Sequence, residues 1–227
     1  MKTNCTPVNE KVLDGLSPIV REKLSGILMR QCYRSGEYIF AQGEMPDGIY
    51  IIAEGKVKIS RVTPDGYESI LCIRGPGDIF CPVPILDRAE QLGAAVAMTE
   101  VKLEYAHKDP FVELCHEHAE LMTIVQGDCL SQVRRLVRRM ETFAFHSVKD
   151  RVVLTILEGL QAGAPSMNGS FELRIKHQEL AGLVGASRET ISRVLAQLQD
   201  EGVLTVHRER VVIEDLAALK RLLADAE

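Results

Sequence analysis

The spacing of apolar residues changes along the chain, and each spacing predicts a different kind of element. Over residues 16–28 apolar residues recur every three or four positions, which predicts a short amphipathic helix. Ser17 is a favourable N-cap for that helix, and Pro18 fits its first position, where no N–H is needed. From about residue 30 to residue 108 the period falls to two, most clearly over residues 57–62, which predicts strands.

The strand-like runs are short and are separated by glycines and prolines. They span residues 38–40, 48–55, 56–62, 68–73 and 101–106. Pro64-Asp65-Gly66 predicts a turn, because proline presets one backbone dihedral and glycine supplies a positive one. Regularly spaced short strands joined by such turns predict an antiparallel barrel or roll.

A second helical pattern covers residues 110–143. Its apolar residues fall at three- and four-residue steps: Leu121, Ile124, Val125, Leu130, Val133, Leu136, Val137 and Met140. The opposite face carries Arg134, Arg135, Arg138 and Arg139. A long helix with one apolar stripe commonly packs against a partner helix. We therefore interpret it as the interface of a homodimer, the alternative being a helix that packs only on its own domain.

Beyond this helix the pattern predicts a series of short elements. They are a helix at 147–161, a polar loop at 161–170, a strand at 171–175, helices at 177–185 and 188–202, two strands within 204–215, and a final helix. Ser187 is positioned to cap the helix at 188–202, Gly202 to end it, and Asp215 to cap the final helix.

Composition places the chain among globular proteins. It has 227 residues, 46% of them hydrophobic and 26% charged, which is enough for two domains with their own cores. No run approaches the roughly 18 apolar residues of a membrane span, and the N-terminus lacks an apolar secretory segment. We therefore expect a cytoplasmic protein.

The cysteines do not form a recognisable site. They are Cys5, Cys32, Cys72, Cys81, Cys115 and Cys129, with no C-x-x-C pair among them. Neither a zinc ribbon nor a disulfide framework is indicated, and in a reducing cytoplasm we expect free thiols.

The clearest chemical signal lies at residues 177–202. Two helices are joined by a turn around Gly185, which permits an abrupt change of direction. The start of the second helix bears Ser187, Arg188, Glu189, Thr190, Ser192 and Arg193. That end of a recognition helix enters the major groove of DNA, where arginine donates to guanine, glutamate accepts from cytosine, and serine does either.

The residues that follow make this pattern more specific. A charged helix face is by itself more often a solvated, salt-bridged surface, and the net charge of -5 counts mildly against nucleic acid. A helix pair followed by a hairpin is a winged helix-turn-helix, however, and local charge matters more than the sum. His207, Arg208 and Arg210 in the hairpin would lie near phosphates, the alternative being an ordinary exposed turn.

Over nearly its whole length the chain resembles the CRP/FNR superfamily of bacterial transcription regulators. The resemblance rests on HQELAGLVGASRETISRVLAQLQDEGVL, on GEYIFAQGEMPDGIYIIAEGKVKI and on the turn GPGDIF. It implies an α+β chain with a cyclic-nucleotide-binding-type β-roll at 1–110, a long dimerisation helix at 111–145 and a winged helix-turn-helix at 146–227. It also implies a homodimer on a palindromic operator, with RNA polymerase as a further partner.

The resemblance extends to the base-reading residues. Arg188, Glu189 and Arg193 match the CRP-type positions that read a TGTGA-like half-site. Glu189, Ser192 and Arg193 match the FNR-type trio that reads TTGAT. We therefore expect a half-site with a TGA core and leave its outer bases open.

The resemblance places an effector pocket at Gly77, Asp78, Cys81, Arg88 and Gln91. In cAMP-binding members Gly-Glu begins the phosphate cassette and an Arg-Ser pair follows. Here Gly77-Asp78 stands in the first place, Gln91-Leu92 in the second, and Arg88 lies out of register. A buried cyclic phosphate would lack its arginine, so we do not expect cAMP as the effector.

This chain also differs from two other sensor types of the family. The FNR-type [4Fe–4S] cluster needs several N-terminal cysteines, and only Cys5 lies near the N-terminus, so we do not expect that cluster. The haem branch has Gly-Asp-x-Phe-Cys, matched by residues 77–81, followed by a histidine where this chain has Val83. Haem ligation by Cys81, or thiol chemistry with Cys72, stays an alternative to a small buried Cys81.

Catalysis finds no support in the sequence. It contains no nucleophile–base constellation, no P-loop and no metal-ligand cluster. We expect a DNA-binding regulator rather than an enzyme, with a ligand-binding module that does not bind DNA as a further alternative.

Overall fold

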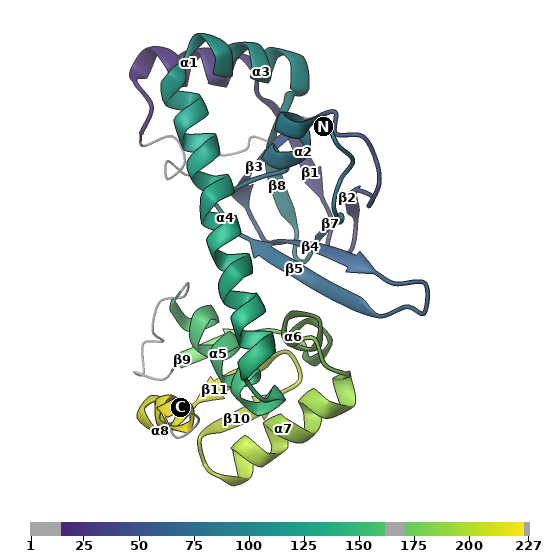
Figure 1. The fold of residues 1–227 in the computed structure, drawn as a ribbon, viewed down its shortest axis with the longest axis vertical. Helices are drawn as coiled ribbons and strands as arrows, with labels where there is room; N and C mark the ends of the chain where they lie inside the picture. Colours follow the sequence, from purple (N-terminus) through teal and green to yellow (C-terminus); the bar gives the residue numbers. More distant parts are fainter. Residues whose placement is uncertain (1–14, 162–170, 225–227) are drawn as a thin grey trace. The chain divides into compact units, whose positions relative to one another are not determined.

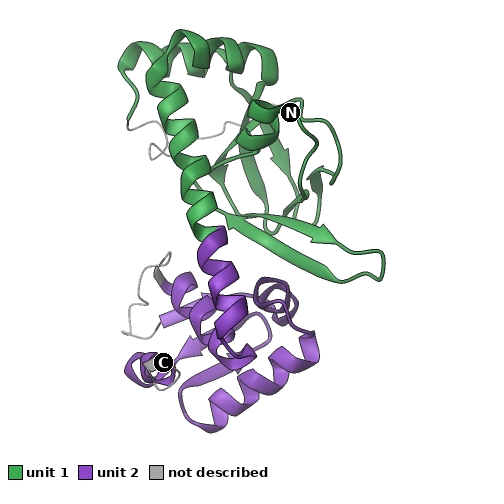
Figure 2. Ribbon diagram, in the orientation of Figure 1, with its two compact units in different colours: residues 1–135 green, residues 136–227 purple. Residues whose placement is uncertain are grey.

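The computed structural model describes residues 15–161 and 171–224, which divide into two compact units (Figures 1 and 2). The N-terminal unit covers residues 1–135 and the C-terminal unit residues 136–227. The boundary falls within a single helix, α4 (Ala119–Phe145). No helix of the described ranges is long and apolar enough to cross a membrane. Nearly all of the predicted loop at 161–170 lies outside these ranges.

The N-terminal unit is built on two antiparallel sheets, as predicted. One, in the order β1-β8-β3-β6, comprises β1 (Met29–Tyr33), β3 (Gly48–Glu54), β6 (Ile79–Phe80) and β8 (Val101–His107). The other, in the order β2-β7-β4-β5, comprises β2 (Tyr38–Phe40), β4 (Val57–Val62), β5 (Glu68–Arg74) and β7 (Ala94–Ala97). The apolar–polar pattern missed β1, β6 and β7.

Both faces of β3 are buried, so this strand separates two layers of the core. Ile49 and Ile51 pack with helices α1 (Pro18–Ile27) and α3 (Lys108–Glu117) and with the start of α4. Tyr50 and Ile52 face the interior of the roll, where aromatic rings gather. The rings of Tyr50 and Phe80 stack there with their centroids 5.0 Å apart.

The predicted helix at 111–145 is divided. Helix α3 ends at Glu117, and α4 begins at Ala119 after His118, whose backbone is extended. The apolar stripe is divided as well, because Leu121 and Val125 are buried in the N-terminal core. The later stripe residues are 50% to 71% exposed: Leu130, Val133, Leu136, Val137 and Met140. We call these five residues the α4 stripe.

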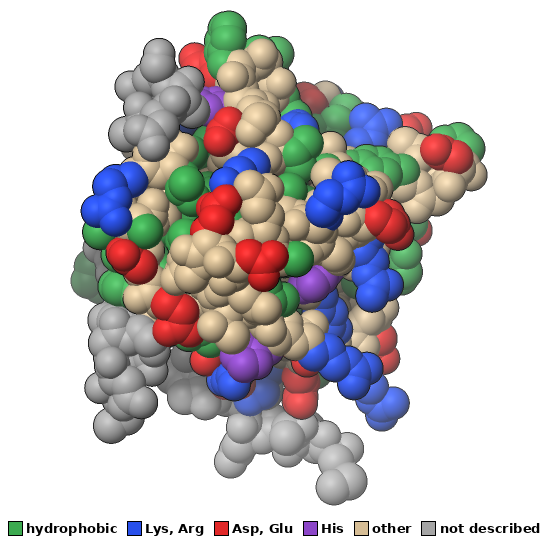
Figure 3. All heavy atoms as spheres, turned by 90° about the horizontal axis from the view of Figure 1, so that it is seen from below, with side chains coloured by type: hydrophobic (Ala, Val, Ile, Leu, Met, Phe, Trp, Pro, Cys, Tyr) green, Lys and Arg blue, Asp and Glu red, His purple; other side chains and the backbone are tan. Residues whose placement is uncertain are grey.

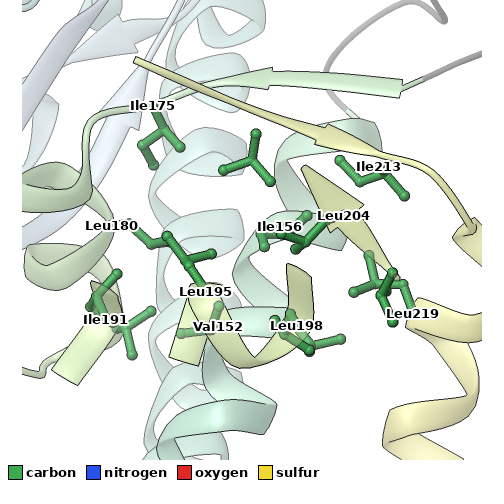
Figure 4. Close-up of a cluster of buried hydrophobic side chains, with 14 of the residues drawn as sticks. Val152, Ile156, Ile175, Leu180, Ile191, Leu195, Leu198, Leu204, Ile213 and Leu219 are labelled. Atoms are coloured by element: carbon green, nitrogen blue, oxygen red, sulfur yellow. The ribbon is translucent and has the colours of Figure 1, made fainter. Parts of the chain in front are cut away.

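The described residues of the C-terminal unit form four helices after α4 and a three-stranded sheet in the order β10-β11-β9. The helices are α5 (Val148–Gln161), α6 (His177–Val184), α7 (Arg188–Asp200) and α8 (Leu216–Ala224). The strands are β9 (Phe171–Arg174), β10 (Leu204–His207) and β11 (Arg210–Ile213). Side chains from α5, α6, α7 and the sheet point toward one another in a single apolar core (Figure 4).

The capping residues differ between the two units. Ser187 accepts a hydrogen bond from the Thr190 N–H at 3.1 Å, and Asp215 accepts one from the Ala218 N–H at 2.8 Å, so both cap as predicted. Ser17 also precedes its helix, but its hydroxyl donates to Glu120 of α4 instead of capping α1. Ser17 therefore links α1 to α4 rather than capping α1.

Candidate nucleic-acid interface

The turn between α6 and α7 favours glycine at position 185. Gly185 has φ +69°, and its N–H donates to the Ala181 carbonyl at 2.8 Å. A Cβ at this position would lie 2.6 Å from Cε1 of Phe143. Sequence, local backbone and packing thus agree on a sharp change of direction between the two helices.

Helix α7 is held from its apolar side. Ile191, Leu195 and Leu198 are all buried in the core of the C-terminal unit. The same helical period places Arg188, Glu189 and Arg193 on the exposed surface, together with the cap Ser187. The structure thus brings the predicted reading residues to one accessible end of α7.

Two other predicted reading residues are half-buried and make contacts within the unit. The hydroxyls of Thr190 and Ser187 lie 3.0 Å apart. Ser192 Oγ lies 3.1 Å from Nδ1 of His177, the first residue of α6. Sequence reasoning did not foresee this link between the two helices, because nothing local couples positions 15 residues apart.

Glu189 is prepared to accept hydrogen bonds. Its own backbone N–H, then Ser187 and then the charge of Arg188 hold the pKa of this carboxyl below its ordinary value. The side chain is therefore ionised at neutral pH, as is needed to accept from the amino group of cytosine.

The hairpin after α7 forms the predicted wing. Strands β10 and β11 pair in antiparallel register up to His207 and Arg210, and both His207 and Arg208 are exposed at the turn. Arg210 is held by the neighbouring strand, because it donates to Glu172 at 3.3 Å. Figure 3 views the molecule from below Figure 1, where blue and red side chains are interspersed and several basic ones gather along one edge. Local positive charge therefore coexists with the negative total.

The C-terminal end of α4 is attached to the helix-turn-helix. Arg139 donates to the carbonyls of Leu183 at 2.7 Å and Gly182 at 3.4 Å, which completes the C-terminal end of α6. The Phe143 ring touches Gly185 and lies 4.8 Å beneath the Arg151 guanidinium. Sequence analysis placed Arg139 on an exposed charged face; its role as a partner of α6 becomes visible only in the fold.

The predicted effector residues are not all alike in their surroundings. Asp78 closes its own turn by accepting from the Gly75 N–H at 2.9 Å, and Gly77 has φ +86° and donates to the Ile52 carbonyl. Arg88 is exposed in the left-handed conformation at the end of α2 (Pro82–Asp87). Cys81 and Gln91, by contrast, contact each other through a side-chain hydrogen bond, and Gln91 is buried.

Arg74 is a buried cation of the N-terminal unit, and it was not predicted from the sequence. It is 4% exposed at the end of β5 and pairs with Asp128 of α4, with N–O distances of 3.3 and 3.4 Å. Its guanidinium also hydrogen-bonds the Cys72 thiol, and its Nε has no partner. An arginine at the end of the apolar run ESILCI is the signal that could have found it.

The surroundings of the two candidate thiols disfavour the thiolate form. Burial is the main cause that raises the pKa of both Cys72 and Cys81, even though Arg74 opposes it. The thiolate is the reactive and ligating form, and these sites disfavour it. Cys81 is already bonded to Gln91, and the position two residues later is Val83, so these residues do not fit a haem ligand set.

Comparisons with known proteins divide the chain as the structure does. Residues 30–118 match the cyclic nucleotide-binding domain model, and residues 149–222 match the Crp-like helix-turn-helix domain model.

Relatives match over nearly the whole length. A CRP-like cAMP-activated global transcriptional regulator of Mycobacterium tuberculosis is 31% identical over 214 residues, covering 92% of this chain and 95% of that protein. The cyclic AMP receptor protein of Thermus thermophilus is 29% identical over 208 residues, covering 92% and 94%. The structure of a CRP/FNR family transcriptional regulator from Thermus thermophilus superposes with a TM-score of 0.75 at 26% identity, covering 88% and 100%.

Proposed function

The chain belongs to the CRP/FNR superfamily of bacterial transcription regulators, and from this premise we propose that it binds a palindromic TGA-core operator as a homodimer. It is a transcription regulator with a helix-turn-helix DNA-binding domain. One observation carries the operator proposal. Arg188, Glu189 and Arg193 stand exposed at one end of α7, while the opposite side of that helix is fixed in an apolar core.

The chemistry of these three side chains supports a sequence with G·C pairs. Arginine donates two hydrogen bonds to guanine, and an ionised glutamate accepts from cytosine. A two-fold dimer would present two copies of α7 to successive major grooves, which favours an inverted repeat. His207 and Arg208 of the wing would lie against the phosphates.

Selection from random duplex DNA tests this proposal. We expect the protein to enrich an inverted repeat with TGA in each half. Arg193→Ala should lower affinity for that repeat by about 30-fold or more, because each half-site loses about 1–3 kcal/mol. Arg221→Ala removes the same charge from α8 and is the matched control. Equal enrichment of the repeat by Arg193→Ala would contradict the assignment.

The homodimer proposal is supported by the α4 stripe. Five large apolar side chains that follow one another along a helix and remain exposed mark an interaction surface. A second copy of the same helix is the simplest partner, since it offers the same stripe.

A charge within the stripe tests the dimer. Met140→Glu should convert dimers to monomers in sedimentation velocity and weaken operator binding, while the circular dichroism of the chain is retained. Glu141→Gln changes the adjacent exposed residue and should leave the dimer intact. A monomeric wild-type protein at micromolar concentration would remove the basis of the proposal.

We further propose that an effector acts through α4. In the N-terminal unit the Arg74–Asp128 pair joins β5 to α4, and in the C-terminal unit Arg139 and Phe143 join α4 to the α6–α7 turn. A signal near Arg74, Cys81 and Gln91 would change how α4 is held. It must favour the DNA-competent arrangement energetically in order to shift it.

The relatives named for cAMP do not settle the effector of this chain. Gln91 is a buried neutral amide hydrogen-bonded to Cys81, and Arg88 is exposed, so at these two positions no arginine faces a buried phosphate. We expect no cAMP binding in calorimetry. A Soret band in anaerobically purified protein, lost in Cys81→Ser, would instead support the haem alternative.

A cytoplasmic location and contact with RNA polymerase complete the proposal.

A further inference from the structure

His177 and Ser192 connect the two helices of the helix-turn-helix. His177 is the first residue of α6, and its Nδ1 lies 3.1 Å from Ser192 Oγ on α7. Ser192 is half-buried and precedes the exposed Arg193. Its hydroxyl can therefore contact His177 and an outside partner together.

The surroundings of the other ring nitrogen, Nε2, bear on which nitrogen of the His177 ring carries the proton. Nε2 is buried and has no hydrogen-bond partner. A proton on Nε2 would be buried without an acceptor, whereas a proton on Nδ1 has Ser192 Oγ as its acceptor. We therefore assign the ring proton to Nδ1, from which it is donated to Ser192 Oγ.

This arrangement determines what Ser192 can offer. A hydroxyl has one proton to donate and can accept from two directions. When Oγ accepts from His177, its proton and one acceptor site remain, and the accepted hydrogen bond polarises the hydroxyl so that it donates more strongly to an acceptor outside the protein. Guanine, adenine and thymine each present an acceptor in the major groove, whereas cytosine presents an amino donor there.

We propose that His177 is a positioning residue that sets Ser192 as a hydrogen-bond donor toward DNA, so that the base facing Ser192 is selected against cytosine. The inference rests on the proposed function, because it requires α7 to read bases. It adds a specificity-determining residue on α6, outside the predicted reading face.

The experiment compares base preference at every half-site position between the wild-type protein and full-length variants. His177→Phe keeps a ring of similar size and removes the hydrogen bond, and Ser192→Ala removes the hydroxyl. The double variant completes a cycle, and Gln178→Ala, at the adjacent exposed residue, is the control.

We expect His177→Phe to relax discrimination against cytosine at one half-site position by about fivefold, the size of one hydrogen bond. In the Ser192→Ala background the same change should have no further effect on preference, because His177 acts through the hydroxyl. His177→Asn, which can supply an amide donor, should restore the preference.

Three outcomes separate the possibilities. Uniform weakening on every sequence, with unchanged base preference, would show a merely structural His177 and overturn the inference. Additive effects of His177→Phe and Ser192→Ala on preference would also overturn it. Failure of the wild-type protein to enrich any inverted repeat would instead overturn the proposed function.

Discussion

Buried polar side chains distinguish the N-terminal unit from the C-terminal unit. Among the described residues they all lie in the N-terminal unit: Ser60, Arg74, Gln91 and Glu104. In the C-terminal unit the fully buried described residues with side chains are apolar, and polar residues such as Arg151 and His177 are half-buried, each with one buried side-chain nitrogen.

The difference has a physical meaning. Burying a charge or an amide is costly unless its partners are present, so a core that holds such groups responds to a change of partner. An apolar core has one well-packed arrangement and offers no comparable response. The buried polar groups make the N-terminal unit sensitive to a change of partner, whereas apolar packing holds α7 in the C-terminal unit.

The largest effect is expected from Leu195→Ala in the C-terminal unit. Leu195 is buried in the apolar core, so the cavity should cost about 4 kcal/mol in the free energy of unfolding. Hydrogen exchange should show the loss in the C-terminal unit, with protection in the N-terminal unit unchanged. Equal loss in both units would mean that they unfold together and would weaken the comparison.

The next largest effect is expected in the N-terminal unit. Asp128→Ala leaves Arg74 buried without its partner and should cost about 3 kcal/mol, near the lower end for broken buried pairs, because Asp128 is 22% exposed. Replacing both, as Arg74→Met with Asp128→Leu, should restore much of the stability in urea denaturation. If the double variant is as unstable as the single one, packing and not charge explains the loss.

A smaller effect is expected at the α6–α7 turn. Gly185→Ala should cost about 2 kcal/mol, from the left-handed backbone and from contact with Phe143. Gly202→Ala isolates the backbone contribution, because Gly202 has φ +72° and nothing within 4 Å of an added Cβ. Equal melting temperatures of the two variants would indicate that Phe143 gives way.

The smallest expected effect is a pH dependence in the stability of the N-terminal unit. Burial raises the pKa of the Glu104 carboxyl, and Arg30 opposes this. The folded protein therefore holds the proton more tightly than the unfolded chain, so this contribution is full below the ordinary glutamate pKa of about 4.3 and is lost as pH rises through the raised value. At pH 7 Glu104→Gln should be as stable as the parent or more stable, with a gain of less than about 1 kcal/mol in the free energy of unfolding. A variant less stable at pH 7 than at pH 4, relative to the parent, would contradict this.

Local patterns account for much of what the sequence predicted. The α7 face follows from helical period, a serine cap and a glycine turn, all within a few residues of one another. Strand β7 was missed because Ala94–Ala97 is apolar on both faces and shows no alternation. The break before α4 was missed because neither glycine nor proline marks His118.

The contacts missed by sequence analysis are those made across long separations. Arg74 and Asp128 are 54 residues apart, and His177 and Ser192 are 15 apart. No periodicity couples such positions, so they become visible only once the fold brings their elements together.

The separation of the exposed residues of α7 from its buried side has an evolutionary consequence. Arg188, Glu189 and Arg193 are exposed, whereas Ile191, Leu195 and Leu198 hold the helix. Exchanges at the first three positions should therefore alter the operator with little loss of stability. A duplicated gene for this regulator could acquire new target promoters by few substitutions, while its fold and its N-terminal unit are inherited unchanged.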